Sequence, residues 1–421
     1  MQLKSLELAE NKLSGPLVDE LGKLSSLTNL TTLILNDNNF VGSIPHEVIP
    51  MLCRLDHFDL SGNRSDNTAV AGLVRNLENI KDQKTISLSR KGLTGRLPNS
   101  LCVQLGTLGE LTKLELPHNQ LSGPLPEELL ALTNLTSLEL CDNAFSGPLP
   151  KDLAKLTRLT SLVLYKNRFT GQIPNELGML SHLEDLELQL NQLTGPIPQG
   201  LGDLINLKNL DLSSNQLSGS LPEDLGGLVS LRTLLLQHNA LSGELPLSVV
   251  RLNANGVIFR LADNDLGFTL PGGFGNIRGV AKLNLSKCSL TGSLPRTLPP
   301  SLASLDLSKN AITDGIPSGW GVLTNLKDLN LSSCALCGPL GRELGESLVN
   351  LKTLWLSNND LSGPPLPDTL QLLAPLASNL EVLSLGGNAL GGAITSVITA
   401  FIRLKRLVLN DMKLEGATHP L

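Results

Sequence analysis

The sequence predicts an α/β solenoid, a curved array of repeats with a parallel β-sheet on its concave face and 3-10 turns on its convex face. The pattern Leu-x-x-Leu-x-Leu-x-x-Asn-x-Leu occurs about 17 times between Leu3 and Leu414. From Leu111 to Leu231, successive copies begin 24 residues apart. Aromatic residues make up only 3% of the chain, against 41% hydrophobic residues, which fits a core of stacked leucines. A fixed period of this length is typical of a solenoid, whose units bury their apolar faces against their neighbours.

The first half of each repeat predicts a short β-strand. In the copy that begins at Leu183, Leu186 and Leu188 alternate with Asp185 and Glu187. An alternation of period two places the leucines on one face of a strand and the acidic residues on the other. Equivalent strands of successive repeats therefore form one parallel sheet, with leucines inside and variable residues on the exposed face.

The asparagine of the pattern predicts a ladder of hydrogen bonds. The chain turns away after the strand and leaves backbone groups that an amide, which both donates and accepts, can satisfy. In the regular block we expect this ladder at Asn119, Asn143, Asn167, Asn191, Asn215 and Asn239. Four repeats carry another residue there, namely Lys91, Cys288, Cys334 and Met412. Because lysine cannot replace an amide, we expect distortion near residue 91.

The second half of each repeat predicts a turn and a short helical segment. It reads Leu-x-Gly-x-Ile/Leu-Pro-x-x-Leu-Gly-x-Leu, as in LTGPIPQGLGDL at 193–204. Glycine permits backbone angles that a β-carbon forbids, and proline fixes φ. The segment that follows the proline is too short for a full α-helix, so we expect a 3-10 turn.

Charge and composition exclude several classes of function. The net charge is −6 and the pI is about 5.6, which argues against a general partner of nucleic acid or anionic membranes, since these need basic stripes. No window approaches 18 uninterrupted apolar residues, so we expect no transmembrane segment. The first 15 residues lie inside a repeat and contain no signal-peptide core.

Catalytic and metal-binding motifs are also missing from the sequence. It contains no nucleophile elbow, phosphate loop or metal-spaced His/Glu motif, and its polar groups repeat instead of converging. The CxxC at Cys334 and Cys337 has no second cysteine pair and no thioredoxin-like context. We therefore expect no catalytic residue, no metal and no cofactor, and we expect the six cysteines to be buried or turn thiols.

The LxGxIP motif in a 24-residue frame resembles the plant-type leucine-rich repeats. Those repeats form the ectodomains of plant receptor-like kinases and receptor-like proteins, and the polygalacturonase-inhibiting proteins. In that family the concave strand residues and their flanks bind peptides, proteins or co-receptors. The resemblance covers nearly the whole chain and implies a non-enzymatic module that binds a protein or peptide ligand, with a co-receptor as a further candidate partner.

The chain also departs from that family. The cysteine-paired caps of the extracellular members do not appear, and no kinase motif follows the repeats. We expect one leucine-rich repeat domain over 1–421, irregular at 55–110 and regular at 111–241. Either the chain is a fragment of a longer surface protein whose C-terminal region is missing, and extracellular, or it is complete, and cytoplasmic. The sequons at Asn29 and Asn134 precede strands and could carry glycan in a secreted protein.

Candidate binding residues are those on the concave face whose type differs from the residue usually found at that position of the repeat. Trp, Tyr and Arg dominate interface energetics when exposed, and histidine or charged neighbours add polar contacts. For Trp355 the alternative is lateral packing on the strands, and for the acidic residues it is a solvated face. The candidates are Glu115, His118, Glu139, Tyr165, Lys166, Arg168, Glu187, Gln189, His238, Arg260 and Trp355.

Two functions from different classes fit this surface. One is recognition of a peptide or protein, and the other is a structural or interaction scaffold, including surface or ice-binding arrays. A scaffold would repeat one residue type at a fixed position, whereas recognition breaks the series. The exposed residues at the equivalent central position of successive strands are of different types, which favours recognition. They are Glu115, Glu139, Val163, Glu187, Asp211, Leu235 and Arg260.

Overall fold

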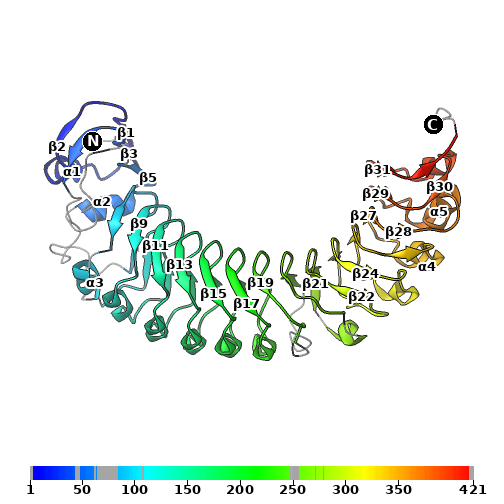
Figure 1. The fold of residues 1–421 in the computed structure, drawn as a ribbon. Helices are drawn as coiled ribbons and strands as arrows, with labels where there is room; N and C mark the ends of the chain where they lie inside the picture. Colours follow the sequence, from blue (N-terminus) through cyan, green and yellow to red (C-terminus); the bar gives the residue numbers. More distant parts are fainter. Residues whose placement is uncertain are drawn as a thin grey trace. The chain divides into compact units, whose positions relative to one another are not determined.

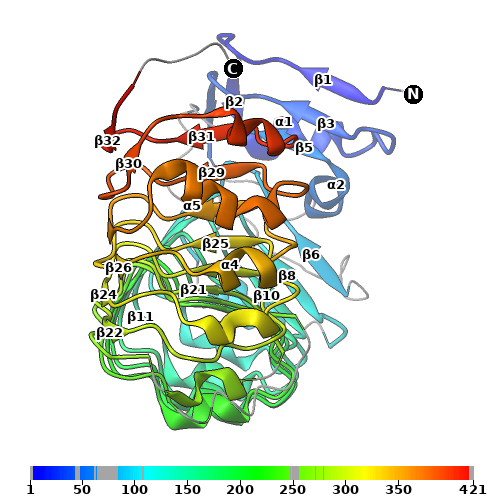
Figure 2. The ribbon, with the colours of Figure 1, turned by 90° about the vertical axis from the view of Figure 1, so that its right-hand side faces the viewer.

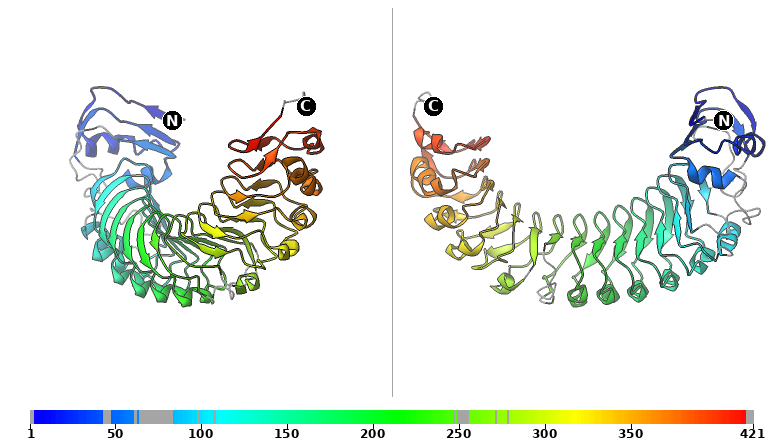
Figure 3. Two further views of the ribbon diagram at one scale, coloured as in Figure 1. Left: turned by 45° about the vertical axis from the view of Figure 1, so that its right-hand side comes forward. Right: turned by 180° about the vertical axis from the view of Figure 1, so that it is seen from behind.

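The computed structural model describes residues 3–42, 48–60, 63, 84–97, 99–106, 109–246, 248, 256–270, 272–277 and 279–416. It comprises two compact units, residues 1–207 and residues 208–421. In each unit the repeats stack side by side, with strands along one side and short helical turns along the other (Figure 1, Figure 3). The expected solenoid of parallel strands and 3-10 turns is thereby confirmed.

In unit 1 the leading strands form two groups. One is a three-stranded parallel sheet of β1 (Ser5–Glu7), β3 (Thr32–Ile34) and β5 (His57–Asp59). The other runs in the order β6 (Thr85–Ser87), β8 (Lys113–Glu115), β10 (Ser137–Glu139), β12 (Ser161–Val163) and β14 (Asp185–Glu187). The leucines pair with leucines across the sheet, as in Leu138 with Leu162.

In unit 2 the leading strands continue the same pattern. Their order is β16 (Asn209–Asp211), β18 (Thr233–Leu235), β20 (Val257–Arg260), β21 (Val280–Asn284), β23 (Ser304–Asp306), β25 (Asp328–Asn330), β27 (Thr353–Trp355), β29 (Val382–Ser384) and β31 (Arg406–Val408). The register shifts by one residue between β20 and β21, where Val257 pairs with Val280 but Ile258 pairs with Lys282.

A second row of short parallel strands follows the turn in each repeat. In unit 1, β2 (Ser14–Pro16) pairs with β4 (Asn39–Val41), while β7 (Thr94–Arg96), β9 (Gln120–Gly123), β11 (Ala144–Pro148), β13 (Arg168–Gly171) and β15 (Gln192–Gly195) lie side by side (Figure 1). In unit 2 the pairs are β17 (Gln216–Gly219) with β19 (Ala240–Leu241), β22 (Thr291–Ser293) with β24 (Ala311–Thr313), β26 (Cys337–Gly338) with β28 (Asp360–Leu361), and β30 (Gly391–Gly392) with β32 (Lys413–Leu414).

The helical segments follow the length of the repeat. Repeats of 24 residues carry 3-10 turns, as expected: η4 (Glu127–Ala131), η5 (Lys151–Lys155), η6 (Asn175–Met179), η7 (Gln199–Asp203), η8 (Glu223–Gly227), η10 (Gly272–Asn276), η11 (Ser318–Val322) and η13 (Ser396–Ala400). Longer repeats instead carry α-helices: α1 (Leu17–Leu24), α2 (Ile49–Arg54), α3 (Asn99–Gly106), α4 (Arg342–Ser347) and α5 (Leu366–Leu372). The repeat that contains α5 also contains the short 3-10 turn η12 (Ala374–Leu376). The expectation of 3-10 turns is therefore wrong for these repeats, because the extra residues allow α-helical i→i+4 hydrogen bonds. Figure 2 shows α4 and α5 stacked on one side of unit 2. In the described part of the chain, no helix is long and apolar enough to cross a membrane.

The core of each unit is a stack of leucines between the strands and the helical turns. Leu162 and Leu186 on the strands and Leu177 in η6 are completely buried. Burying one such side chain contributes about 1.5–3 kcal/mol, and each stack recurs in every regular repeat. Phe145 and Phe169 replace leucines and stack in parallel planes with their ring centroids 6.3 Å apart.

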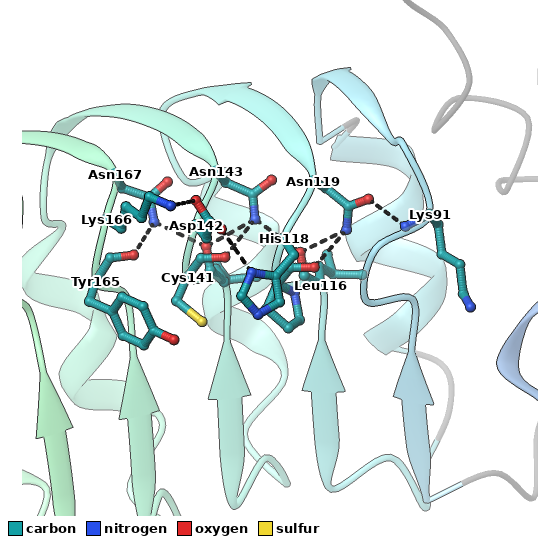
Figure 4. Close-up of polar contacts among 12 residues, drawn as sticks. Lys91, Leu116, His118, Asn119, Cys141, Asp142, Asn143, Tyr165, Lys166 and Asn167 are labelled. Carbon is teal, nitrogen blue, oxygen red and sulfur yellow. Dashed lines mark hydrogen bonds and ion pairs between the residues drawn. The ribbon is translucent and has the colours of Figure 1, made fainter. Parts of the chain in front are cut away.

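The asparagine side chains form hydrogen bonds that join each repeat to the one before it (Figure 4). The backbone N–H of Leu121 donates to Asn143 Oδ1 at 2.9 Å, and Asn143 Nδ2 donates to the Leu116 and Leu140 carbonyl oxygens at 2.9 and 3.1 Å. Equivalent bonds involve Asn38, Asn119, Asn167, Asn191, Asn239, Asn264, Asn310, Asn359 and Asn388. Asn215 donates to the carbonyls of its own turn.

Where asparagine is replaced, only part of this chemistry survives. The Cys288 thiol donates to the Leu261 carbonyl oxygen at 3.2 Å, so it keeps the donor of the missing amide. Lys91 is only 2% exposed, and its Nζ donates to the Leu55 carbonyl oxygen at 2.8 Å. Next to Lys91 the described strands β5 and β6 fall into separate sheets. The remainder of the irregular segment, at 64–83, lies outside the described residues.

We expect Asn167→Ala to lower the free energy of unfolding by about 2 kcal/mol. The Leu140 and Leu164 carbonyls keep a second amide donor, but the buried Phe145 N–H loses its acceptor, and an unsatisfied buried group costs about 1–3 kcal/mol. Urea unfolding followed by circular dichroism measures the loss. The control is Asn206→Ala, whose exposed amide donates to the Ser181 carbonyl. Equal losses of stability in both variants would contradict the role of the ladder.

Close packing of the helical turns makes a second prediction. A β-carbon at Gly178 would overlap the carbonyl group of Gly200 in the next repeat, whereas nothing lies within 4 Å of one at Gly22 in α1. Gly178→Ala should therefore destabilise the protein by about 1–3 kcal/mol, as overpacking does. Gly22→Ala should stabilise it by up to about 1 kcal/mol. Thermal unfolding of both variants decides the matter, and a neutral Gly178→Ala would show that successive turns can move apart.

Candidate functional site

The turn that leaves each leading strand holds one residue in the left-handed backbone region. His118, Asp142 and Lys166 occupy it in three successive repeats, with φ of 57°, 53° and 54°. Residues other than glycine adopt this conformation seldom. Here the following ladder asparagine holds the turn, since its Nδ2 bonds to the carbonyls of the preceding residues. The three side chains consequently form a row along the edge of the sheet.

Within this row the three side chains form a clasp, which we name the first clasp (Figure 4). Asp142 Oδ2 lies 2.8 Å from His118 Nδ1, and Asp142 Oδ1 lies 2.8 Å from Lys166 Nζ. The hydrogen bond from Lys166, and then that from His118, hold the pKa of Asp142 below its usual value. The clasp therefore joins three repeats through one ionised carboxylate.

A second clasp repeats the first in unit 2. His238 Nδ1 lies 2.9 Å from Asp263 Oδ2, and Lys287 Nζ forms an ion pair with Asp263 Oδ1 at 2.5 Å. Bonds from Lys287 and His238 again lower the pKa of Asp263. Sequence reasoning singled out both histidines and Lys166 but missed Asp142, Asp263 and Lys287. The signal was present: at the position before the ladder residue, both triplets read His, Asp, Lys.

Tyr165 lies beside Cys141 on the exposed side of the sheet. Interaction of its hydroxyl with the buried Cys141 thiol, together with burial, raises the pKa of Tyr165 to about 12. Burial is also the main cause that raises the pKa of Cys141. The ring is half-buried and offers its remaining apolar surface to a partner. In Figure 4 the ring reaches toward Cys141 of the preceding repeat.

The strand centres around Tyr165 carry mostly negative charge. Glu115, Glu139, Val163 and Glu187 lie in direct register on β8, β10, β12 and β14. Ser137 Oγ donates to Glu139 at 3.2 Å, and Gln189 Nε2 donates to Glu187 at 3.3 Å. This sheet face of unit 1 therefore presents an ordered acidic surface broken by one valine and one tyrosine ring.

Arg168 does not belong to that face. It begins β13, which pairs with β11 and β15 and not with the leading strands. The left-handed turn at Lys166 and the ladder residue Asn167 lead the chain out of the leading sheet before residue 168. The expectation that Arg168 lies on the concave strand face with Tyr165 is wrong for this reason.

The sheet face of unit 2 differs in charge and shape. Arg260 is exposed on β20, between Leu235 on β18 and Asn284 on β21. Trp355 is half-buried, with the Arg406 guanidinium 5.2 Å from its ring centroid. The Trp355 ring therefore packs against a side chain of a nearby strand, which was the alternative to ligand binding in the sequence analysis. Part of the ring stays accessible.

Several acidic and amide groups on this face are fixed by their own strands. Asp306 Oδ1 accepts hydrogen bonds from the Ser308 backbone N–H and hydroxyl, at 2.9 and 2.6 Å, and Asn330 Nδ2 donates to Asp306 Oδ2 at 3.2 Å. Asp211 is held likewise by Ser213, although burial raises its pKa and the Arg260 charge opposes that rise. These groups are positioned before any partner arrives.

The described residues assemble no metal centre, and two of their thiols are deeply buried. No group of three or more His, Cys, Asp or Glu side chains there could hold a metal ion. Cys102, Cys141, Cys288, Cys334 and Cys337 are free. Burial raises the pKa of Cys102 and Cys288 to about 12, so their reactive thiolate form is scarce at neutral pH.

Comparison with known proteins agrees with this architecture. Two family models, both described as leucine-rich repeat, match residues 181–241 and residues 2–24, 29–51, 134–156, 158–180, 301–323 and 350–372. The receptor-like kinase TMK2 of Arabidopsis thaliana is 28% identical over 124 residues, which span 30% of this chain and 13% of that protein.

Two solved structures are similar over nearly the whole chain. The plant peptide hormone receptor RGFR1, solved in complex with RGF2, has a TM-score of 0.72 and 28% identity and covers 98% of this chain and 75% of its own. A leucine-rich repeat protein of Leptospira interrogans has a TM-score of 0.73 and 28% identity, with 96% and 95% covered. The chain therefore carries leucine-rich repeats at the matched positions. It resembles plant receptor ectodomains in fold.

The first clasp predicts a pH dependence of stability. Because the pKa of Asp142 is lowered in the folded chain, its contribution is present above the unfolded value of about 3.9 and is lost as the pH falls through the folded value. Asp142→Asn should therefore lower the urea midpoint at pH 7, and this difference from the wild type should shrink steadily as the pH falls below the unfolded pKa. Asp152→Asn, which breaks only an exposed pair with Lys155, is the control. A difference for Asp142→Asn that stayed constant from pH 7 to 3 would rule out the ionic clasp.

Proposed function

We propose that the chain is a non-enzymatic module that recognises a peptide or protein segment on the exposed face of its leading strands. The observation that carries the proposal is a mixed set of side chains on a nearly regular backbone. On neighbouring strands of unit 1 the residues in register change from Glu139 to Val163 to Glu187, with the Tyr165 ring just beyond the end of the middle strand. A scaffold would repeat one residue type there.

The physical properties of the face support recognition. Parallel strands lie about 4.8 Å apart, so residues of an extended segment can meet groups on successive strands. Tyr165 is half-buried beside Cys141, and Gln189 donates a hydrogen bond to Glu187, so part of the side-chain freedom is already lost before binding. RGFR1, whose fold this chain shares, was solved in complex with RGF2, which is a precedent for such a role.

The test begins with peptides selected from a random display library against the whole chain. We expect Tyr165→Ala to weaken binding of a peptide held by unit 1 by about 1–3 kcal/mol, the range for an aromatic anchor. Tyr165→Phe, which keeps the ring, should lose much less. Isothermal titration calorimetry measures both, with circular dichroism as a check on folding.

Met179→Ser is the matched control, because Met179 is 65% exposed at the end of η6, on the helical side of unit 1. Binding that ignores Tyr165→Ala, Glu187→Ala and Trp355→Ala alike, but responds to Met179→Ser, would move the site away from the sheet face. If no peptide is enriched, the scaffold alternative is favoured.

A further inference from the structure

We infer that Leu190 is an apolar anchor of unit 1, placed at the edge of the leading sheet to receive an apolar side chain of the recognised segment. The inference deepens the proposed function and rests on it, since the anchor serves the same partner. It is carried by a strained backbone conformation, by the exposure of the leucine, and by its position next to Tyr165 and Gln189.

The backbone conformation of Leu190 is unfavourable for a leucine. The residue precedes the ladder residue Asn191 and has a φ of 57°, in the left-handed region. Besides glycine, the residues that enter this region most readily are asparagine, aspartate and histidine, whereas a bulky side chain there is an outlier. Among the described residues other than glycine that have a positive φ, Leu190 is the only apolar one. The equivalent residues of the two preceding repeats are Asp142 and Lys166.

The fold gains little from a leucine at this position. The turn is held by Asn191, whose Nδ2 donates to the Leu188 and Gln189 carbonyl oxygens, and the Leu190 side chain is 52% exposed. A single exposed leucine is ordinary on a protein surface, but here the exposure coincides with a conformation that costs energy. Strained residues of this kind cluster where they serve a function.

Leu190 lies next to the turn that carries Tyr165. The Lys166 backbone N–H donates to the Gln189 carbonyl oxygen at 2.9 Å, and the Asn167 N–H donates to the Leu190 carbonyl oxygen at 3.3 Å. The turns of the two repeats are therefore side by side, at the same end of β12 and β14. The half-buried Tyr165 ring and the exposed Leu190 side chain thus add two apolar surfaces to a sheet face whose strand centres are mostly acidic.

Gln189 adds a polar group to this contact. Its Nε2 donates to Glu187 at 3.3 Å, while its Oε1 is buried and has no hydrogen-bond partner in the described part of the protein. An unsatisfied buried acceptor is costly. The backbone N–H of a bound segment supplies the missing donor once the amide rotates toward it. A partner that places an apolar side chain on Leu190 brings such an N–H to the same turn.

The experiment compares four forms of the full chain: the wild type, Leu190→Asn, Leu190→Met and Ile205→Asn. Asparagine suits the left-handed conformation but removes the apolar surface, whereas methionine keeps that surface. Ile205 is the matched control, because it is 54% exposed, follows η7 on the helical side of unit 1 and has no positive φ. Each form selects peptides from the same random display library, and thermal unfolding is measured for all four.

Leu190→Asn should raise the midpoint of thermal unfolding, because asparagine relieves the strain, and should nevertheless weaken binding. We expect the other three forms to select peptides with an apolar residue at one fixed position, and Leu190→Asn to lose that preference. In isothermal titration calorimetry, a peptide selected by the wild type should bind Leu190→Asn about tenfold more weakly. Leu190→Met and Ile205→Asn should bind it about as tightly as the wild type.

Several results would overturn the inference while the proposed function stands, provided that Tyr165→Ala still weakens binding. A lower thermal midpoint for Leu190→Asn would show that the leucine serves the fold. Unchanged binding in Leu190→Asn, or an equal loss in Ile205→Asn or Leu190→Met, would show that the apolar surface of Leu190 is not what the partner contacts. If no form selects a peptide, the proposed function fails, and the anchor fails with it.

Discussion

The structure depends on one constraint, the need to satisfy backbone groups where each strand ends. A three-residue strand leaves N–H and C=O groups exposed as the chain turns into the interior, and buried groups of this kind must be paired. One asparagine per repeat supplies an acceptor to the preceding repeat and donors to two carbonyls, as Asn143 does for Leu121, Leu116 and Leu140. Because the amide joins two repeats, it also sets the register in which the leucines stack.

Because of that constraint, some residues of each repeat serve the fold and others are available for function. The leucines and ladder residues are required by the fold, whereas most of the side chains that alternate with them on the strands lie outside the leucine stack and can vary. The left-handed residue before each ladder asparagine is also free to vary, and the two clasps use it. Function can therefore change on this chain without a change of fold, which is why a mixed surface series is more informative than any single residue.

The fold was predictable because its determinants recur in every repeat. The strands, the ladder and the 3-10 turns of the 24-residue repeats follow from local patterns that the sequence displays many times. The site was only partly predictable. Arg168 lies beyond the turn at Lys166 and so belongs to the second row of strands. Tyr165 lies beside Cys141, which comes from the preceding repeat. Such pairings depend on register between repeats, which no single repeat encodes.

Departures from the regular period account for the differences between the two sheet faces. Where repeats keep 24 residues, as from Leu111 to Leu207, successive strands pair without a shift and their faces differ only in side chains. Beyond Leu231 the spacing varies from 22 to 29 residues, and the extra residue Ala281 enters β21. A strand cannot absorb a residue without bending, and bending separates side chains that would otherwise pack together. An open depression lined in part by Arg260, Lys282 and Asn284 lies at this bulge, so an irregular period and a local change of shape occur together. In a repeat protein, therefore, the residues that disturb the period deserve as much scrutiny as those that vary on its surface.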